Sequence, residues 1–196
     1  MQFFILSSSF SSTATPLLEQ IDDGSLAPGP TCRSCGEMLS NMRETECVSF
    51  KLKGAAEDCL TTGMEFAIRE DALAKLRKYV NLGEAVEQRC QVLSKTQTLS
   101  DYVLLYPDPE YVRFDKSFTR LETDVVRGCD LCGVSSLNYL DGFDFADETW
   151  GGLDLFISGR VFGEVLATDT FKSVCEENNF SGFRFVPTSS FGFDYR

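Results

Sequence analysis

Histidine is absent from this sequence of 196 residues. Its absence excludes Ser-His-Asp and Cys-His nucleophile pairs, imidazole acid–base catalysis and every metal site that mixes cysteine with histidine. Any metal must therefore be bound by thiolates or carboxylates. The catalytic chemistry that remains for Asp, Glu, Lys, Tyr or a lone Cys leaves no recognisable pattern here, so we expect a protein that is not an enzyme.

Long apolar runs are also missing, because no stretch approaches the roughly 18 residues that span a bilayer. The apolar start Met1–Leu6 has no positive charge before it and is shorter than the core of a signal peptide. We interpret it as a first β-strand and expect a cytoplasmic protein without membrane contact. In that reducing compartment the eight cysteines favour metal binding over disulfides.

Basic residues are few, with 18 Lys and Arg against 30 Asp and Glu and a net charge of −12. Such a field repels phosphate backbones, so direct nucleic-acid binding is disfavoured. The excess of acidic residues is unevenly distributed. The first 100 residues carry 13 acids and 10 bases, and the last 96 carry 17 acids and 8 bases. An acidic surface of this kind favours a basic protein partner.

The chain has enough apolar residues, 43% including 17 Phe, to form one folded domain over residues 1–196. Residues 7–30 are rich in Ser, Thr, Pro and Gly, which predicts a long surface loop with a short helical turn near 17–21. The oligomeric state is left open by the sequence.

Two strand–helix units are predicted, at residues 65–83 and 164–187. The first helix is expected from about Asp71 to a stop at Asn81 and Gly83, and Thr168 or Asp169 should cap the second. Between the two units, prolines separate 102–106 from 111–114, which predicts a hairpin. Together these features predict an α+β fold: a mostly antiparallel or mixed sheet, two main helices and a zinc-ribbon-like pair of cysteine knuckles.

The cysteine knuckles lie at residues 31–36 and 128–133, where Cys32-x-x-Cys35-Gly36 recurs as Cys129-x-x-Cys132-Gly133. Two intervening residues let a tight turn direct both sulfurs at one cation, and the following glycine permits a left-handed closing residue. Four thiolates in a tetrahedral array suit Zn²⁺, with iron as the competitor. We predict a structural Zn²⁺ site made by Cys32, Cys35, Cys129 and Cys132, because four protein ligands leave no open position for catalysis.

Alternatives to a shared site are two independent dithiols, either redox-active or inert. A shared ion would close a loop of nearly a hundred residues, worth about 4–5 kcal/mol in the loop-entropy model. Arg33 and Arg127 are positioned either to offset the thiolate charge or as ordinary surface residues. The other cysteines, Cys47, Cys59, Cys90 and Cys175, lack paired spacing.

The segment 141–154 combines five acids with two Phe and the only Trp and has no base. Carboxylates can steer a basic protein while rings act as buried anchors. The other interpretation is a solvated connection whose rings pack into the core. The candidate partner-binding residues are Asp141, Phe143, Asp144, Phe145, Asp147, Glu148, Trp150 and Asp154.

The twin C-x-x-C-G motifs, the Met-x-Phe-Phe start and the closing segments resemble the bacterial double-CXXCG motif family. The closing segments in question are 154–156, 165–171 and 180–187. The resemblance covers roughly residues 125–190, 1–6 and 31–36 and is poor between 45 and 120. It implies a role in bacterial competition, since members are linked to immunity against toxins that neighbouring cells deliver by contact. It also implies metal binding at the four matching cysteines.

We therefore expect an immunity protein that binds and neutralises a cognate toxin, most simply a basic nuclease domain. The alternative is a zinc-ribbon adaptor that makes protein contacts in transcription or RNA processing. A dithiol oxidoreductase is the third hypothesis, and one tightly bound zinc would exclude it because the ion would occupy all four paired thiols.

Overall fold

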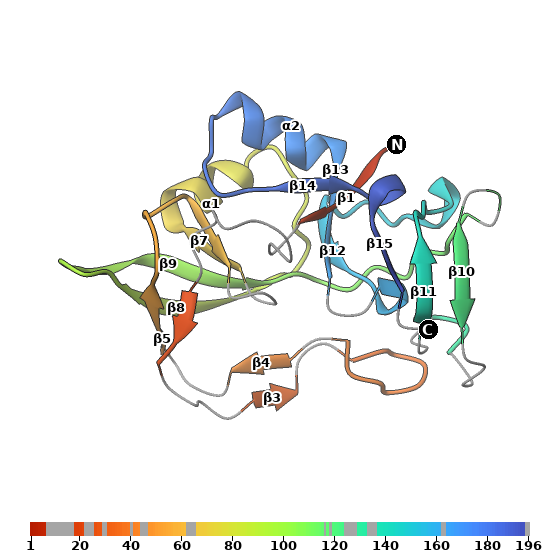
Figure 1. Ribbon diagram of the computed structural model, residues 1–196, viewed down its shortest axis with the longest axis horizontal. Helices are drawn as coiled ribbons and strands as arrows, with labels where there is room; N and C mark the ends of the chain where they lie inside the picture. The colour runs from red at the N-terminus through yellow and green to blue at the C-terminus, as the bar shows by residue number, and fades with distance from the viewer. Residues whose placement is uncertain are drawn as a thin grey trace.

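The computed structural model describes residues 1–6, 18–21, 26–28, 31–39, 41–43, 47–61, 66–115, 117, 119–123, 129–132, 137–161 and 164–194. Within these ranges the chain has an α+β fold, with two α-helices and strands that form four sheets (Figure 1). The predicted fold class, two helices with mixed and antiparallel sheets, is confirmed. None of the helices in the described ranges is long and apolar enough to cross a membrane.

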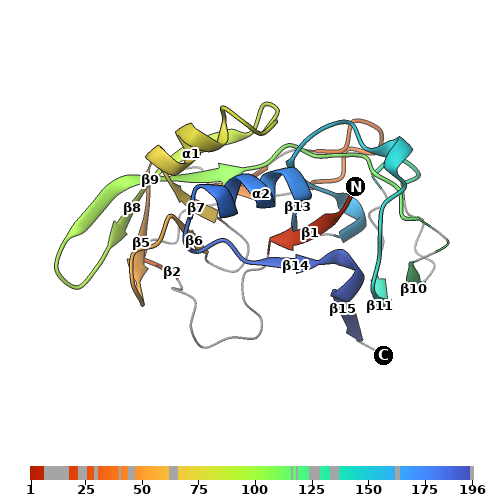
Figure 2. The ribbon, with the colours of Figure 1, turned by 90° about the horizontal axis from the view of Figure 1, so that it is seen from above.

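The largest sheet has six strands in the order β2-β5-β8-β9-β7-β6. Their bounds are β2 Leu18–Gln20, β5 Cys47–Leu52, β6 Cys59–Thr61, β7 Phe66–Arg69, β8 Val86–Leu93 and β9 Thr98–Tyr106. All neighbours are antiparallel except β5 and β8, which run parallel. The long β8–β9 hairpin projects at one end of the molecule in both overall views (Figures 1 and 2).

The second sheet has four antiparallel strands in the order β12-β13-β1-β14. Their bounds are β1 Phe3–Leu6, β12 Leu155–Ile157, β13 Val165–Thr168 and β14 Phe185–Pro187. All four residues of β1 are buried, which accounts for its uninterrupted apolar sequence and confirms the predicted first strand. The first strand of the chain therefore lies between two strands from its last third.

Two smaller sheets complete the architecture. β10 (Arg120–Thr123), β11 (Leu137–Asp141) and β15 (Gly192–Asp194) form one, and β3 (Leu26–Pro28) and β4 (Asn41–Arg43) form the other. The described residues also form the 3-10 turns η1 (Asp147–Thr149), η2 (Gly159–Val161) and η3 (Thr188–Ser190).

Strands β2 and β3 lie inside the predicted surface loop 7–30, so that prediction is wrong for these residues, and the rest of the loop apart from Ile21 lies outside the described residues. The expected helical turn near 17–21 is likewise replaced by β2. Its Leu18 is buried and pairs with Leu52 of β5, so sheet pairing overrides the local helical pattern.

Both strand–helix units are present. β7 leads into α1 (Glu70–Leu76), and β13 leads into α2 (Asp169–Glu177). The helix α1 ends about one turn before the predicted stop at Asn81. The side chain of Thr168 caps α2 by accepting a hydrogen bond from the N–H of Phe171, as predicted. The two helices contact each other and lie side by side above the sheets (Figures 1 and 2).

The predicted hairpin between 102–106 and 111–114 is wrong. β9 pairs instead with β7 and β8. After β9 the chain moves to the four-stranded sheet, where Pro109 bridges Ile157 of β12, and further on Phe114 bridges Phe145. This segment therefore connects the six-stranded and four-stranded sheets.

One hydrophobic core is shared by the helices and both large sheets. Alternate residues of each strand face it: Phe66 and Ile68 of β7, and Val165 and Ala167 of β13. The opposite face of the four-stranded sheet packs against a second, aromatic-rich core that includes Phe3, Phe143, Phe145 and Phe156. The cysteine knuckles pack on the first of these cores.

Candidate metal centre

The first knuckle is a tight turn closed by backbone hydrogen bonds. The N–H of Cys32 donates to the carbonyl of Glu37 at 2.7 Å, and the N–H of Gly36 donates to the carbonyl of Cys32 at 2.8 Å. Gly36 has a φ of 73°, the left-handed conformation expected of the residue after the second cysteine. The N–H of Ser34 points at the Cys32 sulfur, 3.4 Å away.

The second knuckle places its sulfurs in a comparable turn. The backbone N–H groups of Leu131 and Cys132 donate to the Cys129 sulfur. Residues 128 and 133, at the ends of the predicted knuckle, lie outside the described residues. In both knuckles the first cysteine thus receives N–H donors from the residues that follow it, which stabilises a thiolate.

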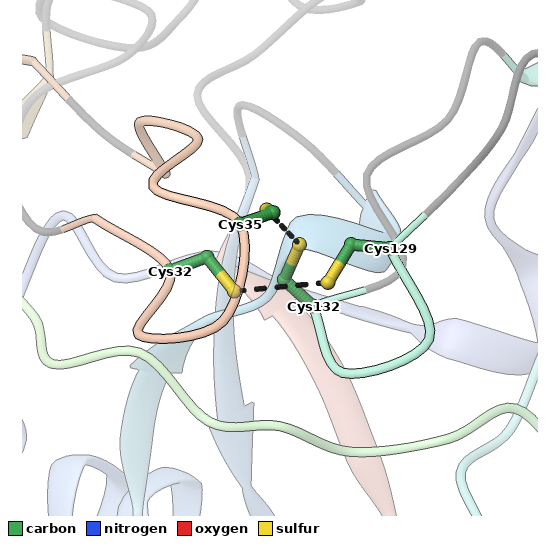
Figure 3. Close-up of side chains that lie close together, drawn as sticks. All are labelled: Cys32, Cys35, Cys129 and Cys132. Carbon is green, nitrogen blue, oxygen red and sulfur yellow. Dashed lines mark hydrogen bonds between the residues drawn. The ribbon is translucent and has the colours of Figure 1, made fainter.

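The two knuckles bring all four sulfurs together although they lie 97 residues apart in the sequence. The Sγ atoms of Cys32 and Cys129 are 3.9 Å apart, those of Cys35 and Cys132 are 3.7 Å apart, and all four lie within 4.8 Å of one another (Figure 3). A tetrahedral ion with bonds of about 2.3 Å to sulfur needs an edge of about 3.8 Å between sulfurs. The arrangement therefore fits a four-thiolate metal site, and the eight cysteines, all of them in the described residues, form no disulfide.

The donor set is composed of sulfur alone. Within the described part of the chain, these cysteines are the only group of three or more potential ligands close enough to share an ion. Tetrahedral S₄ sites bind zinc or iron. The structure thus supports metal binding by the four predicted residues.

The environment of the sulfurs is uneven. Cys32 and Cys132 are buried, Cys129 is half-buried and Cys35 is exposed. The N–H donors of Cys132 and Leu131 lower the pKa of Cys129 to about 6. At Cys32, burial raises the pKa, but the N–H groups of Cys35 and Ser34 outweigh it, so the pKa falls below its usual value. Metal binding needs deprotonated sulfur, so these donors favour the ligand form of both cysteines.

The knuckles rest on the protein core rather than on a mobile surface. Cys32 and Cys132 belong to the core cluster that contains Leu155 and Ile157 of β12. On the outer side, the guanidinium of Arg33 lies 4.8 Å from the ring centre of Tyr111, and the N–H of Arg33 approaches the Tyr111 hydroxyl at 3.5 Å. The first knuckle is therefore attached to the segment that connects the two large sheets.

The sequence did not identify Arg160, a half-buried cation beside the second knuckle. Its Nη2 donates to the carbonyl of Asp130, which lies between the two cysteines, at 3.1 Å. The sequence points instead to Arg33 and Arg127, of which Arg33 stacks on the ring of Tyr111 and Arg127 lies outside the described residues. No local pattern could indicate Arg160, because it follows Cys132 by 28 residues and depends on the tertiary fold.

The remaining cysteines do not join the cluster. Cys59, Cys90 and Cys175 are buried and Cys47 is exposed. Burial raises the pKa of Cys175 to about 12 and raises that of Cys59 as well, so both stay neutral as small apolar side chains.

The aromatic side chains of segment 141–154 lie mainly in the core. Phe143 and Phe145 are buried, and Phe145 contacts Phe3 edge-on at a centroid distance of 5.3 Å. Trp150 is half-buried and its Nε1 donates to the carbonyl of Leu153 at 2.9 Å. Phe143 and Phe145 are therefore not surface anchors for a partner, because their burial holds the aromatic core together.

The acids of the same segment divide into two groups. Asp154 is buried and accepts hydrogen bonds from the backbone N–H of Asn81 at 2.8 Å and the hydroxyl of Thr168 at 2.6 Å. Asp141, Asp147 and Glu148 are exposed, and Asp144 is partly buried. Asp154 thus stabilises the fold, and the exposed carboxylates contribute to the negative charge of the surface.

A polar hollow of about 350 Å³ adjoins Asp147 and Glu148. Its lining includes Asp115, Asp144, Asp147 and Glu148, and the N-terminal amine of Met1 pairs with Asp147 at 3.3 Å. Burial raises the pKa of Asp144, and the negative charges of the neighbouring Asp147 and Asp115 raise it further.

No protein-family model and no curated protein matches the chain.

Proposed function

We propose that Cys32, Cys35, Cys129 and Cys132 hold one structural Zn²⁺. The observation that carries the proposal is the mutual approach of four sulfurs at distances close to a tetrahedral edge. With four protein ligands the ion has no open position for water or substrate, which favours a role in stability over one in catalysis.

Metal analysis of the purified protein tests this site. We expect one zinc per chain in the native protein and in a Cys47→Ser control, which removes an exposed cysteine outside the cluster. The double variant Cys32→Ser/Cys129→Ser should contain no tightly bound metal. Iron in place of zinc would change the identity of the ion, and an equal metal content in the double variant would overturn the site.

We propose further that the protein is a cytoplasmic immunity protein that binds and neutralises a basic toxin domain. The support is the resemblance to the double-CXXCG motif family together with the net charge of −12. Opposite charge accelerates the encounter of two proteins. The exposed carboxylates Asp141, Asp147 and Glu148 would contribute to this capture.

Binding to toxins encoded by adjacent reading frames tests the function. A pull-down should recover one such toxin, and co-expression should protect cells from it. The association rate should fall steeply as salt rises, and a rate that does not change with salt would exclude electrostatic capture.

A matched pair of triple variants tests the binding surface. Asp141→Asn/Asp147→Asn/Glu148→Gln should slow association more than Glu70→Gln/Glu176→Gln/Glu177→Gln, which removes the same charge from the two helices. Equal rates for the two variants would assign the capture to net charge alone.

A further inference from the structure

Arg160 joins the chain just after the four-stranded sheet's strand β12 to the second knuckle by a hydrogen bond. It lies in η2, directly after β12. Its Nε donates to the carbonyl of Val112 at 2.9 Å, and its Nη2 donates to the carbonyl of Asp130 at 3.1 Å. Val112 is fully buried, so one side of the guanidinium is attached to the core while the other holds the turn between Cys129 and Cys132.

The charge of Arg160 lies in the field of the sulfurs. Burial lowers the pKa of its guanidinium, as does the neighbouring Arg113, whereas Cys132, Cys129 and Asp130 raise it. Four thiolates with Zn²⁺ carry a formal charge of −2. A half-buried cation at this position offsets part of that charge.

The planar guanidinium is suited to this position. Its N–H donors point in fixed directions, so one side chain can serve the carbonyls of Val112 and Asp130 at once. A lysine at the same place would keep the charge but would lack this fork. The two contributions, charge and orientation, can therefore be separated by substitution.

We propose that Arg160 is a positioning residue of the metal centre, which orients the second knuckle through Asp130 and offsets the negative charge of the metal-bound thiolates. The inference rests on the zinc site proposed above. Residues outside the ligand set that orient ligands change metal affinity by about 10–100-fold when they are substituted.

Zinc affinity, measured by competition with a chromophoric chelator, tests the role. Arg160→Gln should weaken zinc binding by about 10–100-fold, and Arg160→Lys should fall between this variant and the wild type. Arg77→Gln is the matched control, because Arg77 pairs with Glu87 on the surface at the end of α1, and it should bind zinc like the wild type. An Arg160→Gln variant with wild-type affinity overturns the proposal.

The rate at which iodoacetamide alkylates the zinc-bound protein distinguishes an electrostatic effect of Arg160 on the thiolates from a general effect on folding. Loss of the nearby positive charge makes the thiolates more nucleophilic, so Arg160→Gln should react faster than the wild type, whereas Arg160→Lys should react at about the wild-type rate. Equal acceleration in both variants overturns the electrostatic role. A wild-type protein that binds no zinc overturns the site itself, which distinguishes that failure from a failure of the role of Arg160.

Discussion

Gly36 and Gly182 both have a positive φ but lie in different surroundings. Gly36 has a φ of 73°, and a Cβ added there would meet no atom within 4 Å. Gly182 has a φ of 85°, and a Cβ added there would overlap the carbonyl of Cys59. The first position therefore requires glycine for conformation alone, and the second requires it for both conformation and space.

Substitution of these glycines by alanine should separate the two effects. Gly36→Ala should lower the free energy of unfolding by about 1 kcal/mol, the usual cost of a left-handed alanine. Gly182→Ala should cost several times more, because the backbone of β6 must move as well. Thermal denaturation of the two variants measures the difference, and equal losses would contradict the close contact with Cys59.

Glu164 is the residue that precedes β13, and its carboxyl group is largely buried. Burial raises its pKa to about 7 from an ordinary value of 4.5, so the folded state binds a proton more tightly than the unfolded state. Stability from this group is present at low pH and is lost as the pH rises through about 7. Glu164→Gln should therefore be stabilising relative to the wild type at pH 8, by about 1–2 kcal/mol after allowance for solvent screening.

Denaturant unfolding at two pH values tests this prediction. The advantage of Glu164→Gln should shrink below about pH 5, where the folded wild type is also neutral at this position. Because both proteins keep the four cysteines, pH effects on the metal centre cancel in the comparison. An advantage of the same size at pH 5 and pH 8 would contradict the raised pKa.

The metal ligands could be predicted from the sequence because both sulfurs of a knuckle lie within one local turn. The spacing of Cys32 and Cys35 and the glycine after them are fixed by that turn alone. The position of Arg160 depends on η2, Val112 and the second knuckle meeting in space, and no short sequence pattern contains this information. For the same reason the sequence could not separate the buried acid Asp154 from the exposed acid Asp147. The two differ in their tertiary partners.

At the scale of the elements, α2 is held at its start by a small buried network. The hydroxyl of Thr168 accepts from the N–H of Phe171 at 3.3 Å and donates to Asp154 at 2.6 Å. Asp154 also accepts from the N–H of Asn81. One hydroxyl thus joins the helix cap to the segment that follows α1.

Loss of this hydroxyl should destabilise the protein. Thr168→Ala removes the cap and leaves a buried carboxylate oxygen of Asp154 without its donor, which should cost about 2 kcal/mol or more. Thr168→Ser keeps the hydroxyl and should cost less than half as much. Equal losses for Ala and Ser in denaturant unfolding would assign the effect to the methyl group and not to the hydrogen bonds.

Strand–helix units could be recognised from local periodicity, but partners of strands could not. The residues of β13 and α2 follow the predicted pattern, including the cap at Thr168. The segment 111–114 has the alternation of a hairpin strand, yet its partner is residue 145 and not β9. Pairing is decided by which apolar faces can be buried together, so the predicted hairpin is wrong although its sequence alternates.

At the scale of the whole molecule, a metal ion at the four cysteines would join two segments 97 residues apart. Removal of zinc by a strong chelator should lower the free energy of unfolding by up to about 4–5 kcal/mol, the loop-closure value for this length. For a chain of this size the melting temperature should fall by roughly 8–20 °C. Calorimetry with and without chelator measures the effect, with Cys32→Ser/Cys129→Ser as the variant that should show no further loss.

The central place of β1 has a consequence for synthesis on the ribosome. Residues 18–106 contain every strand of the six-stranded sheet, so that part of a nascent chain holds its own pairing partners. β1 is synthesised before that sheet but pairs with β13 and β14, so its four apolar residues stay without their sheet until translation has passed residue 187. A strand made before the whole six-stranded sheet is thus enclosed only after that sheet can form, and during that interval its apolar side chains are exposed to chaperones.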